Sequence, residues 1–154
     1  MSDDGAQVRL WVAAALVWCE GRLLLQRRAI TAKHGAGKLE FPGGKIEPGE
    51  SAESALAREL IEEWGPAAAE LEVGRIATVL HHVYPPPGPE VQLLLYSVDA
   101  PSWTPADWKS RVRAEEGVIL EDYPVSELPI EDFLEADQEL VRALRAGTLL
   151  RGSD

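Results

Sequence analysis

Apolar residues fall in short runs along the chain, and charged residues, glycines and prolines separate one run from the next. The first run covers residues 9–19, and the Glu20-Gly21 pair then leads into three leucines, which predicts a hairpin between two buried strands. Further strands are expected at about residues 72–84, 91–98 and 117–123. The segment 85–89 is too rich in proline to join a sheet interior, so it is predicted to be a surface loop.

Two segments show the periodicity of amphipathic helices. The first runs from about Ser51, a preferred N-cap residue, to Trp64, and a glycine and a proline directly after it are expected to end it. Its core-facing side chains are predicted to be Leu56, Leu60, Ile61 and Trp64. The second helix is expected over residues 130–146. Residues 101–114 favour no element. The pattern predicts a mixed α/β fold, arranged as one domain over residues 1–154.

The first predicted helix carries three glutamates on one face. Glu59, Glu62 and Glu63 stand at positions i, i+3 and i+4, so their carboxylates are expected within reach of a common point. Like charges crowded in this way repel one another unless a cation lies among them. Carboxylate oxygens are hard ligands and no His or Cys lies nearby in the sequence, so the cation expected is Mg²⁺, with Mn²⁺ as a substitute.

The spacing around these glutamates resembles the Nudix box, G-x5-E-x7-R-E-U-x-E-E-x-G-U, in which U is an aliphatic residue. The residues that match are Gly44, Glu50, Arg58, Glu59, Leu60, Glu62, Glu63 and Gly65. Pro66, at the final aliphatic position, departs from the pattern, and this change concerns the helix exit rather than metal chemistry. The resemblance to the Nudix hydrolase superfamily, with the box at residues 44–66, implies a mixed β-sheet sandwiched between helices (α/β/α).

The likeness extends beyond the box to the MutT-like branch of the superfamily, the (deoxy)nucleoside triphosphate pyrophosphohydrolases. Residues 38–47, with the sequence KLEFPGGKIE, are similar to the signature of that branch. Arg28 and His34 match positions that contact the substrate there, and Phe41 is assigned to the same expected substrate site. A solvated loop residue is the alternative for His34.

The resemblance also implies roles for residues around the three glutamates. The carbonyl of Gly44 is expected to join the metal site, and Arg58 is expected to pair with a neighbouring carboxylate and fix its orientation. Glu116 is the expected downstream glutamate that completes the metal site, with Glu115 as the competing choice. Glu50 is either a further ligand or a carboxylate favoured at the start of a helix.

Two residues outside the box are candidates for base recognition. Tyr84, which a proline follows, resembles an aromatic residue near the nucleobase, and Asp137 lies where MutT-like enzymes carry an Asn or Asp that reads the base edge. Packing of Tyr84 on the core is the alternative. The proline-rich segment, and Asp122 where many relatives have Trp, depart from the pattern of the branch. The preferred base therefore stays open.

The implied reaction is hydrolysis of a nucleoside diphosphate linked to another group, and specifically of a (d)NTP to the monophosphate and pyrophosphate. Glu59 or Glu116 would accept the proton of the attacking water. A dinucleoside polyphosphate is the main rival substrate, because Tyr84 lies 18 residues beyond the box, close to where such hydrolases carry a tyrosine. An ADP-ribose-type substrate is less favoured. A catalytically silent nucleotide-binding domain would lack one or more of the Arg-Glu-x-x-Glu-Glu positions of the box, and none is lost here.

Composition limits the partners of the chain. The net charge is −11 with a pI near 4.7, which argues against a nucleic acid polymer because binding its phosphate backbone requires a basic face. Cys19 is the single cysteine, which rules out an internal disulfide framework and suits a reducing cytoplasm. It lies in an apolar run and is expected in the core. The apolar stretch that contains it is too short to span a bilayer, so no membrane attachment is expected. A small-molecule nucleotide is the expected partner of a monomer or homodimer.

Overall fold

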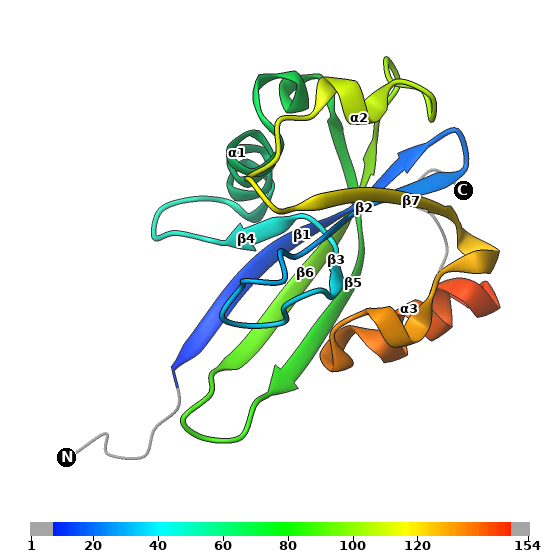
Figure 1. The fold of residues 1–154 in the computed structure, drawn as a ribbon. Helices are drawn as coiled ribbons and strands as arrows, with labels where there is room; N and C mark the ends of the chain where they lie inside the picture. Colours follow the sequence, from blue (N-terminus) through cyan, green and yellow to red (C-terminus); the bar gives the residue numbers. More distant parts are fainter. Residues whose placement is uncertain (1–7, 149–154) are drawn as a thin grey trace.

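Within residues 8–148, which are the residues that the structure describes, a mixed sheet of seven strands lies between helices on its two faces (Figure 1). The structure is a computed structural model. The strands are β1 (Arg9–Cys19), β2 (Arg22–Arg27), β3 (Leu39–Glu40), β4 (Gly43–Lys45), β5 (Glu72–Val83), β6 (Glu90–Asp99) and β7 (Ile119–Pro124). The α-helices are α1 (Ala52–Trp64), α2 (Trp108–Arg111) and α3 (Glu135–Ala146), and short 3₁₀-helices cover Pro66–Glu70, Val125–Glu127 and Ile130–Asp132.

The strand order is β3-β2-β1-β6-β5, with β4 beside β1 and β7 beside β2. β1 runs parallel to β6, and the other strand pairs are antiparallel. The predicted first hairpin is present, since Cys19 at the end of β1 pairs with Arg22 at the start of β2. β3 and β4 were not predicted, because a strand of two or three residues shows no periodicity in the sequence.

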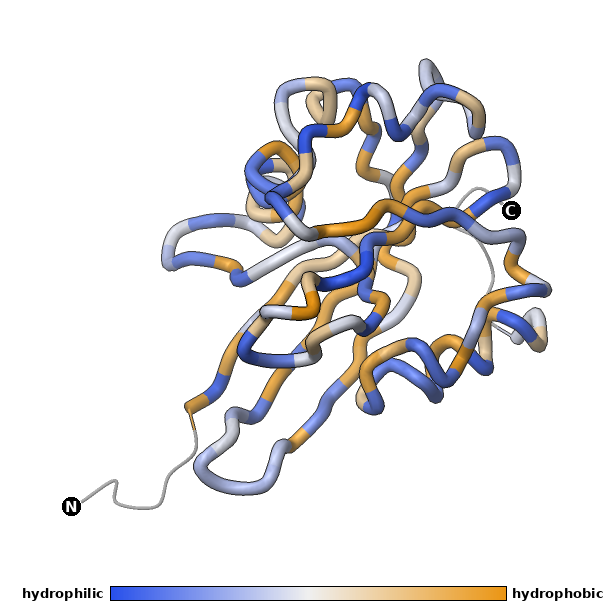
Figure 2. Tube along the Cα trace, in the orientation of Figure 1, coloured by the Kyte–Doolittle hydropathy of each residue, from blue (hydrophilic) through white to orange (hydrophobic). Residues whose placement is uncertain are grey.

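Alternate residues of β1 pack on opposite faces of the sheet. One buried cluster joins Ala13, Ala15 and Val17 to Leu56, Leu60 and Trp64 of α1. The other joins Ala14, Leu16 and Trp18 to Leu140, Val141 and Leu144 of α3. Figure 2 shows the hydrophobic residues along the central strands and many hydrophilic residues in the loops. Since successive side chains of a strand point to opposite sides, β1 is buried on both faces, and the predicted α/β/α arrangement is confirmed.

Helix α1 begins and ends where the sequence predicts. The hydroxyl of Ser51 accepts a hydrogen bond from the backbone N–H of Ser54 at 3.1 Å. Gly65 has φ 87°, and its N–H donates to the carbonyl of Ile61 at 2.8 Å. The buried residues of α1 are Ala55, Leu56, Leu60 and Trp64. Ile61 is 42% exposed, so the prediction that it faces the core was wrong. It lies about 100° around the helix from Leu60, outside the buried stripe.

Residues 101–114, for which the sequence favours no element, bring two tryptophans into the core. Trp103 and Trp108 are 2% and 0% exposed. Their rings lie 6.3 and 5.6 Å from the ring of Trp64, measured between centroids. Cys19 belongs to the same cluster, as predicted. The three indoles therefore fix the C-terminal end of α1 against the sheet.

The terminal helix is shorter than predicted, because α3 begins at Glu135 rather than at residue 130. Residues 130–132 form a 3₁₀-helix, and Phe133 then has extended backbone angles and pairs with Leu39 in an isolated β-bridge. This pairing requires extended backbone, so an α-helix cannot continue through Phe133. Across residues 8–148, no helix is both long and apolar enough to cross a membrane.

Candidate active site

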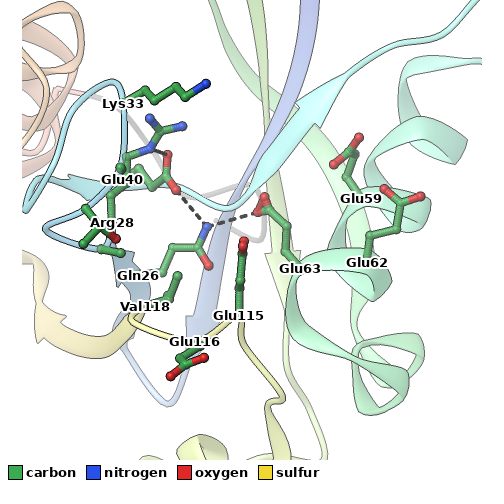
Figure 3. A pocket seen from close by; sticks show the side chains of 13 residues that line it. Gln26, Arg28, Lys33, Glu40, Glu59, Glu62, Glu63, Glu115, Glu116 and Val118 are labelled. Carbon is green, nitrogen blue, oxygen red and sulfur yellow. Dashed lines mark hydrogen bonds and ion pairs between the residues drawn. The ribbon is translucent and has the colours of Figure 1, made fainter.

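One cavity brings together the glutamate face of α1, residues of β2 and β3, and the segment before β7 (Figure 3). Its volume is about 590 Å³. The charged residues that line it are Arg28, Lys33, Glu40, Glu59, Glu62, Glu63, Glu115 and Glu116. Carboxylates thus outnumber cations on its walls. Three of the carboxylates, those of Glu59, Glu62 and Glu63, belong to α1 and are together named the α1 wall.

Arg58 organises the carboxylates at the outer end of the α1 wall. Its Nη1 donates to Glu59 Oε1 at 3.0 Å and to Glu62 Oε2 at 3.1 Å, so the predicted pairing is present. Its Nε and Nη2 donate to the two oxygens of Glu50 at 2.7 and 2.8 Å. This bidentate pair lowers the pKa of Glu50 to about 2. Glu50 is therefore held as the partner of Arg58 and is not among the residues that line the cavity.

Glu63 is a carboxylate of the site whose pKa departs strongly from its ordinary value. Its Oε1 accepts hydrogen bonds from the backbone N–H of Gly43 and from Nε2 of Gln26, both at 3.1 Å. Burial nevertheless raises the pKa of Glu63 to about 8, and the charges of Glu40 and Glu59 act in the same direction. In the absence of a cation, this position therefore favours a protonated carboxyl group at neutral pH.

The residue types of the site suit a metal ion, but their side chains do not meet at one point. Across residues 8–148, no three His, Cys, Asp or Glu side chains are arranged to hold a metal ion. The three glutamates of α1 line one cavity without reaching a common point, and each is held by a hydrogen bond: Glu59 and Glu62 by Arg58, and Glu63 by Gln26. The donors are all oxygen, and a divalent cation would offset the burial and the repulsion by Glu40 and Glu59 that together raise the pKa of Glu63. The residues present therefore fit a hard cation.

The backbone of Gly44 lies in close contact with the carboxylate of Glu59. A Cβ added at Gly44 would lie 2.3 Å from the carboxyl carbon and from Oε2 of Glu59. Only glycine therefore lets this carboxylate lie beside the backbone whose carbonyl was predicted to join the metal site.

Gly44→Ala is expected to lower kcat by about 100-fold, because displacement of a reactive group by about 1 Å has that effect. The melting temperature should change little, since the atom displaced is the end of a flexible side chain. Gly43→Ala is the contrasting variant: its Cβ would lie 2.2 Å from the carbonyl oxygen of Ala13, and Gly43 has φ 155°. Gly43→Ala should therefore destabilise the fold. Thermal denaturation and kcat measured on both variants test this difference, and an unchanged kcat in Gly44→Ala would contradict it.

The two candidate downstream glutamates both line the cavity and both belong to the segment between α2 and β7. In Figure 3 the side chain of Glu115 points toward Glu63, whereas that of Glu116 points away from it. Glu115, the competing choice in the sequence, is therefore better oriented than Glu116 to join the carboxylates of α1.

The predicted substrate residues near β2 and β3 have different surroundings. Arg28 lines the cavity, and its Nε donates to Glu40 Oε1 at 3.0 Å. His34 is exposed and does not line the cavity, although its backbone carbonyl accepts a hydrogen bond from Arg28 Nη1. Phe41 is 7% exposed, and its ring stacks on that of Phe133 at 5.4 Å, so it packs in the core instead of facing the cavity. The assignment of Phe41 to the substrate site has no support in this packing.

Tyr84 and Asp137 do not line the cavity of Figure 3. Each interacts electrostatically with a residue that does, Tyr84 with Arg28 and Asp137 with Glu40. Burial raises the pKa of Tyr84, the charge of Asp137 adds to this, and Arg28 opposes it. Burial also raises the pKa of Asp137 to about 6, and the charge of Glu40 acts in the same direction. The fold thus brings Tyr84, Asp137, Arg28 and Glu40 into one neighbourhood, although these residues are far apart in the sequence.

Gln26 and Glu40 are functional candidates that the sequence did not reveal. Nε2 of Gln26 donates to Glu40 Oε2 at 3.0 Å as well as to Glu63. Gln26 is only 5% exposed. The available signal was an amide at the end of the leucine-rich run of β2, where an apolar residue would be expected.

The chain is similar over much of its length to known proteins. A family model described as NUDIX domain matches residues 9–144. A segment of 58 residues is 50% identical to the 8-oxo-dGTP diphosphatase of Escherichia coli (strain K12), covering 37% of this chain and 44% of the relative. A segment of 54 residues is 48% identical to the CTP pyrophosphohydrolase of the same strain, covering 35% of this chain and 39% of the relative. The chain thus spans less than half the length of these relatives.

A solved structure extends the similarity to nearly the whole chain. The solution structure of the E. coli ORF135 protein has a TM-score of 0.69 and 29% sequence identity, and the match covers 97% of this chain and 98% of that chain. The range matched by the family model, residues 9–144, contains the three glutamates of the α1 wall, Arg28 and the segment that carries Glu115. Together with the box residues on α1, these similarities show that the chain belongs to the NUDIX domain family.

Proposed function

We propose that the chain is a hydrolase that cleaves a phosphoric anhydride bond in nucleoside diphosphates linked to another group. The preferred substrate class is a (d)NTP, which would give the monophosphate and pyrophosphate. The observation that carries this proposal is the α1 wall of Glu59, Glu62 and Glu63, which faces Arg28 across one cavity. Nudix hydrolases generally use divalent metals, and Mg²⁺ is the ion that this set of oxygen ligands favours, with Mn²⁺ as a substitute.

The residues of the site divide the chemistry between them. Mg²⁺ held by Glu59, Glu62, Glu63 and the Gly44 carbonyl would neutralise charge on the phosphate oxygens and lower the pKa of water. Arg28 presents a guanidinium that suits a phosphate or a base edge. Water adds to phosphorus as the P–O anhydride bond breaks, pyrophosphate leaves, and a carboxylate accepts the proton of the water.

Three carboxylates are candidates for the general base. Glu59 lies on the α1 wall, and Glu115 and Glu116 lie in the segment that faces it. The orientation of Glu115 toward Glu63 favours it over Glu116. In each case the protein contributes mainly by positioning and by charge stabilisation, as is usual for phosphoryl transfer.

The base and the leaving group define the alternatives. The two E. coli relatives are named for an oxidised purine nucleotide and for CTP, and the local identities of 50% and 48% do not separate them. A dinucleoside polyphosphate remains the rival substrate because of the position of Tyr84. A catalytically silent nucleotide-binding domain is disfavoured, because Arg58 and the three glutamates of α1 are all present. Hydrolysis of canonical, oxidised and methylated (d)NTPs and of dinucleoside polyphosphates, with product identification, tests the proposal.

Tyr84 and Asp137 are proposed to read the base. Tyr84→Ala should raise KM by the equivalent of about 1–3 kcal/mol, which is the contribution of one base–aromatic stack. Asp137→Ala should flatten the ranking among bases, because a buried polar reader discriminates by leaving groups unpaired. Values of kcat/KM for at least four bases, measured beside melting temperatures, check both variants.

An exposed residue of α3, the helix that carries Asp137, supplies the control for this experiment. Glu135 begins α3 and is exposed, so Glu135→Ala should leave the base ranking unchanged. If Tyr84 and Asp137 are structural, both of their variants will lose melting temperature, and all substrates will suffer alike. An unaltered ranking in both variants would remove these residues from the base site.

A further inference from the structure

Gln26 is a buried polar residue at the end of an apolar run. Leu23, Leu24 and Leu25 precede it in β2 and are fully buried, and Gln26 itself is 5% exposed. Burial of an amide costs free energy unless its donors and its acceptor are bonded. An apolar side chain would satisfy the packing at this position without that cost. The amide therefore points to a role beyond packing.

The amide of Gln26 joins the core to two carboxylates. Trp64 Nε1–H donates to Gln26 Oε1 at 2.7 Å. Nε2 of Gln26 donates to Glu63 Oε1 at 3.1 Å and to Glu40 Oε2 at 3.0 Å. An indole N–H can only donate, so the amide oxygen must face Trp64, and the two amide hydrogens must face the carboxylates. The reverse orientation would set an N–H against an N–H and the amide oxygen against two carboxylates.

The direction of the indole N–H is fixed by the core. Trp64 is 0% exposed and packs against the rings of Trp103 and Trp108. A ring held in this way has no alternative orientation without repacking of its neighbours. The indole therefore fixes the amide, and the amide fixes the two carboxylates, which Figure 3 shows on either side of it.

The connection continues from Glu40 to the substrate side of the cavity. The second oxygen of Glu40, Oε1, accepts a hydrogen bond from Arg28 Nε at 3.0 Å. Gln26 thus lies between Glu63 of the α1 wall and Glu40, which in turn binds Arg28. We propose that Gln26, anchored by Trp64, is a positioning residue that orients Glu63 for the metal ion and Glu40 for Arg28. This inference rests on the proposed function, because it takes the roles of Glu63 and Arg28 from there.

Two tryptophans that differ mainly in what their indoles bind provide the test. Trp64 and Trp108 are both fully buried, and Trp108 Nε1 donates to Asp122 Oδ2 at 2.8 Å, not to a residue that lines the cavity. Trp64→Phe should lower kcat by about tenfold and raise the Mg²⁺ concentration needed for half-maximal rate, because Gln26, the outer partner of Glu63, would lose the hydrogen bond that anchors its amide. Trp108→Phe should lose a comparable melting temperature and keep kcat within about twofold.

Gln26→Leu removes the amide and keeps the approximate size of the side chain. It should lower kcat by about 10- to 100-fold and raise the Mg²⁺ requirement, with a smaller effect on KM than Arg28→Ala. A fall in kcat of equal size in Trp64→Phe and Trp108→Phe would overturn the positioning role. So would a Gln26→Leu variant with unchanged kcat and Mg²⁺ requirement.

A measurement that does not use activity completes the test. The indole N–H resonances of Trp64 and Trp108 can be assigned in ¹H–¹⁵N spectra of the full chain from the signals lost in the two Phe variants. Mg²⁺ should shift the Trp64 resonance, because its hydrogen bond leads to Glu63, and should leave that of Trp108 in place. A Trp64 shift in a protein that hydrolyses no nucleotide would support the positioning role and contradict the proposed function. An unmoved Trp64 resonance at saturating Mg²⁺ would overturn the positioning role, whatever the enzyme hydrolyses.

Discussion

Glu63→Gln and Glu59→Gln are each expected to lower kcat by about two to four orders of magnitude, the range for loss of a charge-stabilising or acid–base group. Both carboxylates line the cavity on the α1 wall, and a neutral amide cannot replace either as a metal ligand of the same charge. The measurement is steady-state turnover of the best (d)NTP at saturating Mg²⁺, with the melting temperature of each variant recorded beside it.

The fold should survive both substitutions. Burial raises the pKa of Glu63 to about 8, so the metal-free protein holds this group at a cost whenever it is ionised. Glu63→Gln should therefore keep or raise the melting temperature of the metal-free protein at alkaline pH. Glu53→Gln is the matched control, because Glu53 is exposed on the first turn of α1 and does not line the cavity. Full turnover by the wild type in excess chelator would refute the metal-dependent reading of the α1 wall.

Features of the site that depend on local helix geometry could be predicted from the sequence. The i, i+3, i+4 spacing places the three glutamates of α1 on one cavity, and Ser51 caps the helix as its position predicts. The contact of Arg58 with its neighbours is also local, because i, i+4 residues lie on adjacent turns. The orientation of each carboxylate could not be predicted from the spacing, because it also depends on hydrogen bonds to Arg58 and Gln26.

Features that depend on tertiary contacts could not be predicted in the same way. The partners of Gln26 come from β3 and from the far end of α1, and no spacing in the sequence joins them. Phe41 belongs to a signature segment, yet its contact with Phe133 draws it into the core. Glu115 and Glu116 are adjacent, so their directions depend on a turn that contains Gly117 at φ 89°. A sequence pattern can name such residues but cannot orient them.

Activity is expected to fall on the acid side of pH 8, and added Mg²⁺ is expected to restore it. The pKa of Glu63 is raised from 4.5 to about 8 in the metal-free fold. A metal ion binds the ionised carboxylate, so its apparent affinity should fall by about tenfold for each pH unit below that pKa. The Mg²⁺ concentration for half-maximal rate should therefore rise by about 50-fold between pH 8, where half of the Glu63 groups are still protonated, and pH 6, and the optimum should be alkaline.

The same shift has a signature in stability, and its sign can be worked out. Because the folded pKa of Glu63 lies above the unfolded value, the native state holds a proton that the unfolded chain has lost between pH 4.5 and pH 8. The metal-free protein should therefore lose stability as pH rises through this window, while the rise in melting temperature on adding a fixed Mg²⁺ concentration should grow. Glu63→Gln should lose both dependences. An acid limb of kcat that ignores Mg²⁺ concentration would point instead to a general base outside the α1 wall.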